Sequence, residues 1–295
     1  MASAALEKLI AAKRANPYQA DKSIDALRAE ANARADEPLP EGASFEIVDA
    51  DGVPAEWVDG AGATPDRTFF FIHGGGYYRG SPASSRATSA RISAATGARV
   101  LSTSYRLAPE HAFPAAIDDV YTAYRWMLAQ DVDPVKTMIG GISAGGGLTL
   151  ALLLKLKDAG DPLPGGAVPM SAWTDMTQGA ETFRSKSDAD PTISKGYLDR
   201  MSGYYLNGAD PKTPLASPLF GDLSGLPPLL LQVGTSETML DDSRLFAEKA
   251  VSAGVDATYQ PWDDMIHGWH GSAAVLPEAQ EAIDAVGTFF RARIS

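Results

Sequence analysis

The chain has 295 residues, 45% of them hydrophobic and 21% charged, a balance that fits one large globular domain or two smaller ones and excludes disorder, collagen and coiled coil. Lys and Arg number 25 against 37 Asp and Glu, so the formal net charge is −12, which disfavours nucleic acid and anionic membrane surfaces as partners. Because the sequence has no cysteine, disulfides, thiolate metal sites and a cysteine nucleophile are excluded.

The N-terminal region is predicted to be helical over residues 1 to about 38. Charged residues interrupt its apolar stretches, so no secretory signal is predicted and a cytoplasmic location is expected. Two short apolar segments follow, Ser44–Val48 and Ala55–Val58, and Asp51-Gly52 between them is a strong hairpin signal. An antiparallel pair is therefore expected to open a sheet.

From about residue 66, short apolar runs alternate with helical patterns, the order that builds a parallel sheet with helices on both faces. Strands are predicted at Thr68–Ile72, Arg99–Ser102, Thr137–Gly141, Ala167–Ser171, Pro228–Val233 and Ala257–Gln260. Helices are predicted between and after them at Ala83–Thr96, Pro114–Ala129, Gly145–Lys157, Asp242–Ala253 and Glu278–Arg293. The uncharged run 137–154 contains five glycines, which favours a strand, a turn and a helix over a membrane span. The pattern predicts an α/β, doubly wound fold.

Two stretches depart from this alternation: the N-terminal helical region, and a polar, aromatic and Pro/Gly-rich segment from Asp175 to about Pro214. Ligands of open α/β sheets bind outside the carboxyl ends of the strands, so these stretches are expected to cover that end and shape a pocket. The alternative is a peripheral helical decoration without a role. Since neither a repeat nor a linker marks a boundary, a single domain with an insertion is expected.

The segment Gly141-Ile142-Ser143-Ala144-Gly145 follows a predicted strand and opens a predicted helix, the context of a nucleophile elbow. Glycines two positions either side of the serine let the strand and helix backbones approach closely. Ser143 would then project its hydroxyl above the sheet. The motif alone is weakly specific, because glycine and serine are abundant in this chain.

A more specific signal is His73-Gly74-Gly75-Gly76, directly after a predicted strand. Glycines allow backbone N–H groups to turn toward a reacting oxygen and stabilise the oxyanion of acyl transfer. We assign the oxyanion hole to the N–H groups of Gly75, Gly76 and Ala144. A phosphate loop is disfavoured because Gly147 and Leu148 follow Gly146 where Lys and Ser/Thr are needed, and neither glycine cluster contains the Gly-x-Gly-x-x-Gly motif of dinucleotide binding.

A serine nucleophile needs a base, most often histidine. Of the four histidines, only His267 and His270 follow Ser143, as the α/β-hydrolase order of nucleophile, acid and histidine requires. His267 is preferred because Gly268 beside it allows a close approach to the serine. His270 would instead lie at the surface or support the site from outside it.

The third member is a carboxylate that orients the imidazole and stabilises its positive charge. Glu237 lies in the loop nearest the tip of the strand Pro228–Val233. Asp241 and Asp242 fit the cap of the next helix, whereas Asp263 and Asp264 are too close in sequence to reach the far nitrogen of His267. These residues alone leave Glu237 and the two helix-start aspartates as competing candidates.

Together these motifs resemble those of the hormone-sensitive-lipase-like family of α/β-hydrolase carboxylesterases. The resemblance runs from about residue 66 to the end of the chain, and its motifs are His73–Tyr77, Tyr105–Glu110, Phe113–Ala116 with Asp118, the serine elbow, Ala216–Pro218 and His267-Gly268. The family's acid usually begins an Asp-Pro-Leu-x-Asp stretch, and here Glu237–Asp241 matches it. The resemblance therefore implies Glu237 as the acid, with glutamate in place of aspartate and Asp241 in reserve. Ile142 departs from the Asp or Thr of many relatives.

The resemblance also implies a mostly parallel eight-stranded sheet flanked by helices, with residues 41–174 and 215–295 as the α/β-hydrolase domain. Residues 1–40 and 175–214 would form its helical cap. It implies short acyl esters as substrates, neither cofactor nor metal, and a possible homodimer through the strand near Ala257–Gln260. The residues expected to line the substrate pocket are Tyr77, Tyr78, Trp173, Met176, Tyr204, Tyr205 and Ile266.

The predicted reaction is two-step acyl transfer through an acyl-enzyme on Ser143. A lactone hydrolase or an acyltransferase with the same triad is the alternative within the enzyme class. Outside that class, the alternative is a catalytically silent small-molecule receptor, which the presence of His267 disfavours.

Overall fold

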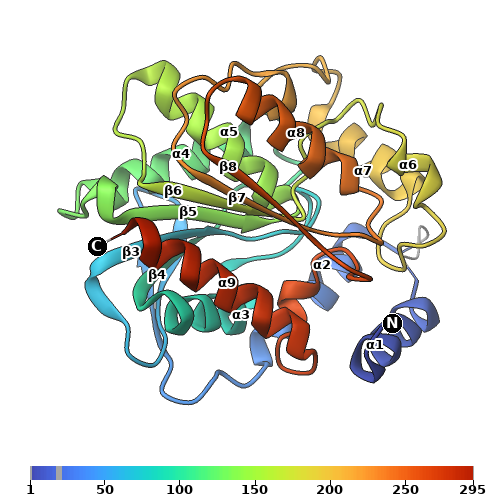
Figure 1. The fold of residues 1–295 in the computed structure, drawn as a ribbon, viewed down its shortest axis with the longest axis horizontal. Coiled ribbons are helices and arrows are strands. Elements are labelled where there is room, and N and C mark those ends of the chain that lie inside the picture. The colour runs from blue at the N-terminus through green and yellow to red at the C-terminus, as the bar shows by residue number, and fades with distance from the viewer. Residues whose placement is uncertain (1, 18–21, 295) are drawn as a thin grey trace.

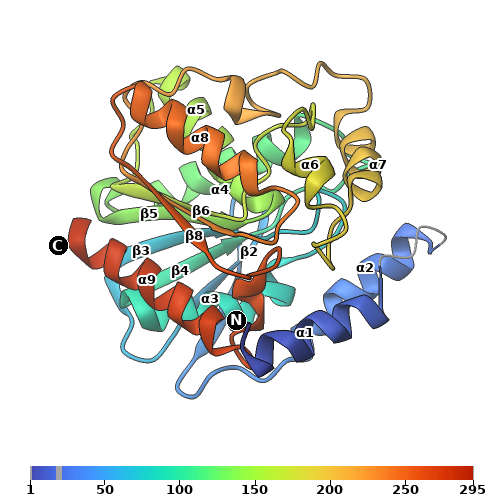
Figure 2. The ribbon, with the colours of Figure 1, turned by 45° about the vertical axis from the view of Figure 1, so that its right-hand side comes forward.

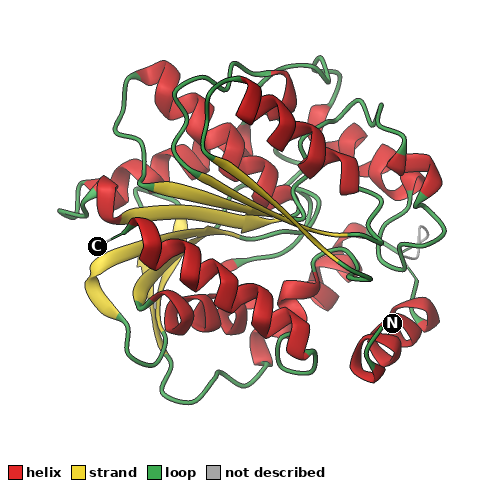
Figure 3. Ribbon diagram, viewed as in Figure 1, coloured by secondary structure: helices red, strands yellow, loops and turns green. Residues whose placement is uncertain are grey.

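A single twisted sheet forms the centre of the molecule. The computed structural model describes residues 2–17 and 22–294, and these residues form a sheet of eight strands in the order β1-β2-β4-β3-β5-β6-β7-β8 (Figures 1 and 3). The strands β1 and β2 pair antiparallel, as do β2 and β4, and the other neighbours are parallel. The strand bounds are β1 Ser44–Asp49, β2 Pro54–Asp59, β3 Thr64–Ile72, β4 Ala98–Thr103, β5 Thr137–Ile142, β6 Gly166–Met170, β7 Leu229–Gly234 and β8 Ala257–Trp262.

Helices cover both faces of this sheet. In Figure 1, α3 and α9 lie below the sheet and α4, α5 and α8 lie above it. The α-helix bounds are α1 Ala4–Ala15, α2 Ile24–Asn32, α3 Pro82–Thr96, α4 Ala115–Leu128, α5 Ala144–Ala159, α6 Thr182–Ser185, α7 Lys195–Leu206, α8 Leu240–Ser252 and α9 Pro277–Arg293. The fold is the predicted α/β-hydrolase arrangement.

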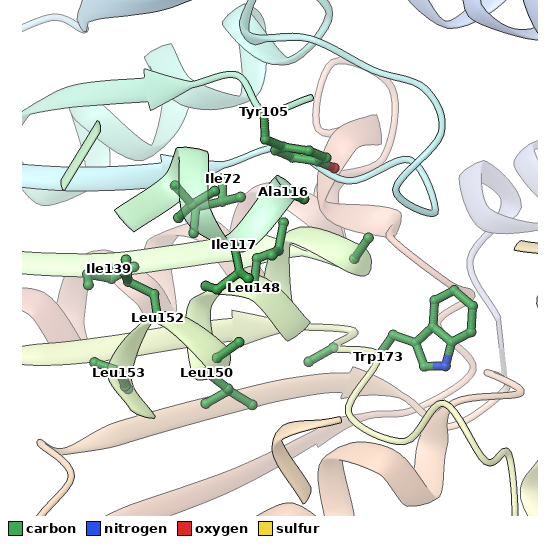
Figure 4. Packing of buried hydrophobic residues seen from close by; sticks show 14 of the residues in the cluster. Ile72, Tyr105, Ala116, Ile117, Ile139, Leu148, Leu150, Leu152, Leu153 and Trp173 are labelled. Carbon is green, nitrogen blue, oxygen red and sulfur yellow. The ribbon is translucent and has the colours of Figure 1, made fainter. Parts of the chain in front are cut away.

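The apolar run in β3 explains why the sheet is buried on both faces. Successive strand side chains point to opposite faces, so Phe69 and Phe71 pack in a cluster with α3 and α9. Phe70 and Ile72 pack with α4 and α5 on the other face, where Figure 4 shows Ile72 close to other buried aliphatic side chains. A continuous apolar run is typical of a parallel strand covered on both sides.

The predicted elements match the observed ones closely, and they differ mainly at their ends. The strand β3 begins at Thr64 rather than Thr68, because Thr64 pairs with Ala98 across a shift in register. Helix α5 continues to Ala159 and ends where Gly160 adopts a left-handed conformation with φ 70°. Helix α8 begins at Leu240, two residues before the predicted start.

The two departures from the strand–helix alternation lie at the carboxyl ends of the strands. Helices α6 and α7 come from the segment after β6, and α1 and α2 from the N-terminal region (Figure 2). Arg28 on α2 anchors the N-terminal part to the core, since its guanidinium pairs with Glu110 and donates to the carbonyl oxygens of Tyr78 and Ala108. Leu6, the residue that α1 buries, packs in a cluster with Met265, Ile266, Trp269, Leu276, Ala279 and Ala282.

No helix within the described ranges combines the length and the apolar character that a bilayer span requires.

Candidate active site

The turn between β5 and α5 holds Ser143 in a strained backbone conformation. Its φ is 61° and its ψ is −119°, values that non-glycine residues rarely adopt. A Cβ atom at Gly145 would overlap the carbonyl oxygen of Ile72, and one at Gly141 would overlap the carbonyl of Gly145. The two glycines are therefore required by close backbone packing, as the elbow motif predicts.

A continuous hydrogen-bonded chain links Ser143, His267 and Glu237. The Nε2 atom of His267 lies 2.8 Å from the Oγ of Ser143, and its Nδ1 lies 2.8 Å from the Oε2 of Glu237. All three side chains are buried, and Glu237 is fully so. Because Glu237 lies in the loop after β7 and His267 in the loop after β8, neighbouring parallel strands deliver both groups to the end of β5.

The second carboxylate oxygen of Glu237 is held from the opposite side. Its Oε1 accepts hydrogen bonds from the Ser171 hydroxyl and from the Gly234 N–H, each at 2.7 Å. The Ser171 oxygen in turn accepts the N–H of Gly268 at 3.2 Å. Sequence reasoning missed Ser171 and Gly234; their positions at the ends of β6 and β7 are the only signal of their role.

The other candidates for acid and base are engaged elsewhere. The Nε2 of His270 lies 3.0 Å from Oε1 of Gln232, and burial lowers the pKa of His270 to about 3. Asp241 pairs with Arg244 at 2.8 Å. Asp242 accepts the backbone N–H groups of Thr174 and Asp175, and burial raises its pKa well above the usual range. None of these three side chains hydrogen-bonds to His267 in the described part of the chain.

The glycine loop faces Ser143 across the site. Gly75 and Gly76 have φ values of 124° and 61°, and a Cβ atom at Gly75 would overlap the carbonyl of Arg79, so only glycine fits there. Among the backbone hydrogen bonds of the described residues, none uses the N–H of Gly75, Gly76 or Ala144 as donor. These three N–H groups are thus available to an oxygen in the site.

His73 supports this loop as a neutral group. Its Nδ1 lies 2.8 Å from the carbonyl oxygen of Gly74, its ring stacks on Tyr105 at 4.3 Å between centroids, and the Tyr105 hydroxyl donates to the His73 carbonyl. Burial lowers the pKa of His73 to about 4, so the imidazole stays uncharged near neutral pH.

A cavity of about 360 Å³ lies over Ser143. Its walls come from the glycine loop, the elbow, the His267 loop, helix α7 and the N-terminal region. The residues that line it include Lys13, Glu30, Arg34, Arg79, Ile142, Ser143, Trp173, Tyr197, Leu198 and His267.

Of the seven residues expected to line the pocket, Trp173 lies on this cavity and the other six lie in the packing around it. Tyr77 and Tyr205 stack on each other with 3.7 Å between ring centroids. The Tyr78 hydroxyl lies 3.5 Å from that of Tyr197, and Tyr197 is the residue that reaches the cavity. Met176, Tyr204 and Ile266 pack in apolar clusters.

Tyr77 differs from the expectation because its position next to the glycine loop in the sequence does not fix where its side chain points. The backbone of Tyr77 has φ 65°, which turns its side chain away from the cavity that Gly74, Gly75 and Gly76 line.

A search for metal ligands finds no cluster of three His, Asp or Glu side chains within residues 2–17 and 22–294 that could hold an ion.

The insertion contacts the loop of Glu237 through the buried carboxylate of Asp190 and through the Thr238 hydroxyl, which donates to the Ile193 carbonyl. Asp190 accepts the backbone N–H groups of Thr192 and Ile193 with Oδ1, and that of Thr238 with Oδ2 at 3.0 Å. Burial raises the pKa of Asp190. These bonds join the wall of the cavity to Thr238, the residue that follows Glu237.

Comparison with known proteins gives a consistent assignment. Residues 69–271 match a family model described as alpha/beta hydrolase fold. An acetyl-hydrolase of Streptomyces hygroscopicus is 43% identical over 246 residues, which cover 83% of this chain and 82% of the relative. The crystal structure of an esterase from the bacterial hormone-sensitive lipase family superposes with a TM-score of 0.96 at 42% identity and covers 100% of both chains. A structure of the esterase EstE5 soaked with p-nitrophenyl butyrate has a TM-score of 0.95 at 42% identity and covers 99% of each chain.

Proposed function

Because the chain belongs to the hormone-sensitive-lipase-like family of α/β-hydrolases and is a carboxylic ester hydrolase, we propose that it cleaves short-chain acyl esters through an acyl-enzyme on Ser143. The observation that carries this proposal is the chain of hydrogen bonds from Ser143 Oγ through His267 to Glu237, at 2.8 Å and 2.8 Å. The Ser143 end of this chain of hydrogen bonds lies in the cavity, beside the N–H groups of Gly75, Gly76 and Ala144, which have no backbone acceptor.

In the first step, Nε2 of His267 takes the hydroxyl proton as Ser143 Oγ attacks the ester carbonyl. The carbonyl oxygen becomes an oxyanion and accepts the N–H groups of Gly75, Gly76 and Ala144. When the tetrahedral intermediate collapses, His267 gives its proton to the departing alcohol and the acyl group stays on Ser143. Glu237 holds Nδ1–H by its hydrogen bond throughout and stabilises the imidazolium.

In the second step, a water molecule replaces the alcohol. His267 removes one proton from the water, whose oxygen attacks the acyl carbonyl, and the oxyanion returns to the same N–H groups. The carboxylic acid leaves, and Ser143 recovers its proton from His267. The Nε2 atom must be unprotonated at the start of each step, and the hydrogen bond from Nδ1–H to Glu237 favours that tautomer.

The size of the cavity supports short acyl groups. A volume of about 360 Å³ lies at the small end of the range for ligand pockets, and the indole of Trp173 and the side chains of Tyr197 and Leu198 bound it. The similarity to an acetyl-hydrolase and to an esterase soaked with p-nitrophenyl butyrate agrees with this expectation.

The test is hydrolysis of p-nitrophenyl esters from acetyl to dodecanoyl by the wild-type protein and by Ser143→Ala. We expect kcat/KM to peak at short chains and to fall by at least about 10⁴-fold in the variant, because the nucleophile is lost. Ser252→Ala, which removes an exposed hydroxyl on α8, is the matched control and should retain full activity. Activity in a folded Ser143→Ala protein would overturn the proposal. Turnover of lactones alone would redirect it to lactone hydrolysis.

A further inference from the structure

Three cationic side chains meet at the mouth of the active-site cavity. Lys13 comes from α1, Arg34 from the short helix η1 (Ala33–Asp36) and Arg79 from the loop after the glycines, and all three line the same cavity as Ser143. A second hollow of about 280 Å³ adjoins the first and shares Lys13, Glu30, Arg79 and Thr192 with it. Lys13 and Arg79 therefore lie where the two spaces meet.

The charges around this mouth do not cancel. Arg34 is paired with Glu37 at 2.9 Å and donates to the Gly271 carbonyl, and Glu30 is paired with Lys22. Within residues 2–17 and 22–294, neither Lys13 nor Arg79 forms an ion pair; the guanidinium of Arg79 lies 5.3 Å from the ring centroid of Tyr78. Two uncompensated positive charges thus face the cavity of a chain whose net charge is −12.

The two charges affect each other, which indicates a local positive field. Partial desolvation, and then repulsion by the guanidinium groups of Arg34 and Arg79, lower the pKa of Lys13. A nearby anion would relieve this repulsion. Cations that line a cleft raise the local concentration of anionic ligands and form charge-assisted hydrogen bonds with a carboxylate.

We propose that the mouth formed by Lys13 and Arg79 selects esters that carry a carboxylate several atoms from the scissile carbonyl, such as monoesters of dicarboxylic acids. This inference rests on the proposed function, because the carboxylate is bound at the mouth while the ester carbonyl lies over Ser143. The two cations act in binding and specificity, and the chemical steps at Ser143 are those given above.

Substrate pairs of equal shape measure this selection. On the acyl side, p-nitrophenyl hydrogen adipate is compared with its analogue in which an isopropyl group replaces the carboxylate. On the alcohol side, p-acetoxybenzoate is compared with p-isopropylphenyl acetate. We expect wild-type kcat/KM to favour the anionic member of at least one pair. The pair that responds identifies the side of the ester that points to the mouth.

The double variant Lys13→Gln/Arg79→Gln should lower the anionic-to-neutral ratio of kcat/KM by about tenfold, since each residue contributes a charge-assisted contact. The matched control is Lys8→Gln/Arg14→Gln, which removes the same charge from exposed positions of α1 outside the cavity lining and should change the ratio by less than about twofold. The swap Lys13→Arg/Arg79→Lys keeps the charge and should preserve most of the preference. Raising sodium chloride from about 20 mM to about 500 mM should reduce the ratio for wild type, for the control and for the charge-preserving swap, and should leave the ratio of Lys13→Gln/Arg79→Gln nearly unchanged.

Two kinds of failure are distinguishable. The inference about the mouth is overturned if wild type hydrolyses the neutral esters through Ser143 but prefers the anionic ester of neither pair. It is also overturned if Lys13→Gln/Arg79→Gln and the control Lys8→Gln/Arg14→Gln lower the ratio equally. In both cases the proposed function stands. If wild type hydrolyses none of the esters, or Ser143→Ala hydrolyses them as well as wild type, the proposed function fails first.

Discussion

At the scale of single residues, the two oxygens of Glu237 have separate partners. Oε2 receives the Nδ1–H of His267, while Oε1 receives the Ser171 hydroxyl and the Gly234 N–H. These bonds fix the carboxylate on both sides, so the additional methylene of glutamate, compared with aspartate, is accommodated without loss of the contact to His267.

The carboxylate of Glu237 is therefore predicted to be the acid of the triad. Glu237→Gln should lower kcat by about 10³–10⁴-fold, because the amide no longer stabilises the imidazolium and can favour the wrong tautomer. Asp241→Asn should change kcat by less than about threefold, since Asp241 pairs with the partly exposed Arg244. Steady-state kinetics on a short p-nitrophenyl ester distinguishes them, and the opposite ranking of the two variants would assign the acid to Asp241.

The sequence pointed to Ser143 and His267 as members of a triad, and the family resemblance pointed to Glu237, but nothing in the sequence pointed to Ser171. Ser143 lies in a motif whose glycine spacing reflects a local requirement, the close packing at Gly145. Ser171 carries no such motif, and its hydroxyl reaches an acid 66 residues away in the chain. Contacts of that kind depend on which strands are neighbours in the sheet, and a strand pattern alone leaves that order open.

At the scale of elements, the pocket residues could not be predicted because the sequence does not show which face of helix α7 points to the cavity. Helix α7 was expected to contribute Tyr204 and Tyr205, whereas Tyr197 and Leu198 are its residues on the cavity. Tyr205 instead stacks on Tyr77. The short insertion carries no regular apolar period that would fix the rotation of α7, so its inward face follows from packing. The strands, by contrast, are buried on both sides and were predictable from their apolar runs.

Helices α3 and α9 pack so closely that a methyl group has no room between them. A Cβ atom at Gly287 would overlap the carbonyl oxygen of Ala95, whereas one at Gly203, on the exposed side of α7, would have no atom within 4 Å. Gly287→Ala should therefore lower the free energy of unfolding by about 1–3 kcal/mol. Gly203→Ala, the matched control, should raise it by about 0.5–1 kcal/mol through helix propensity.

Urea unfolding of both variants beside wild type measures these differences. Because each variant adds the same methyl group to the interior of a helix, propensity alone predicts stabilisation in both. A stabilised Gly287→Ala protein would mean that α3 and α9 can separate without cost, in contradiction to the close contact between Gly287 and Ala95.

At the scale of the whole molecule, stability depends on pH through buried histidines that stay neutral. Burial lowers the pKa of His270 to about 3 and that of His73 to about 4, against about 6.5 in an unfolded chain. Below pH 6.5 the unfolded chain binds these protons and the native protein does not, so their contribution to stability is complete above pH 6.5 and is lost as the pH falls.

His270→Gln isolates one of these groups. The free energy of unfolding of wild type minus that of the variant should become smaller by roughly 2–3 kcal/mol between about pH 7 and about pH 4.5, because only wild type bears the cost of keeping an imidazole neutral. Urea titrations at both pH values give the difference. A difference independent of pH would show that His270 takes up its proton in the native state as readily as in the unfolded one.

Assembly of the molecule is a further property at this scale. A homodimer through β8 stays a prediction, which a light-scattering mass tests directly. The net charge of −12 and the absence of cysteine were readable from composition, because they need no knowledge of contacts. The position of the N-terminal helices was not, since α1 presents a single buried residue, Leu6, to the rest of the protein.

The docking of Leu6 among residues 265–282 has a consequence for how the enzyme is made. Because translation runs from the N-terminus, α1 is synthesised well before the apolar surface that receives it and before His267. Until residues 265–282 have left the ribosome, α1 has no native partner and the proposed base is absent. We therefore expect the growing polypeptide to hydrolyse no esters before that point.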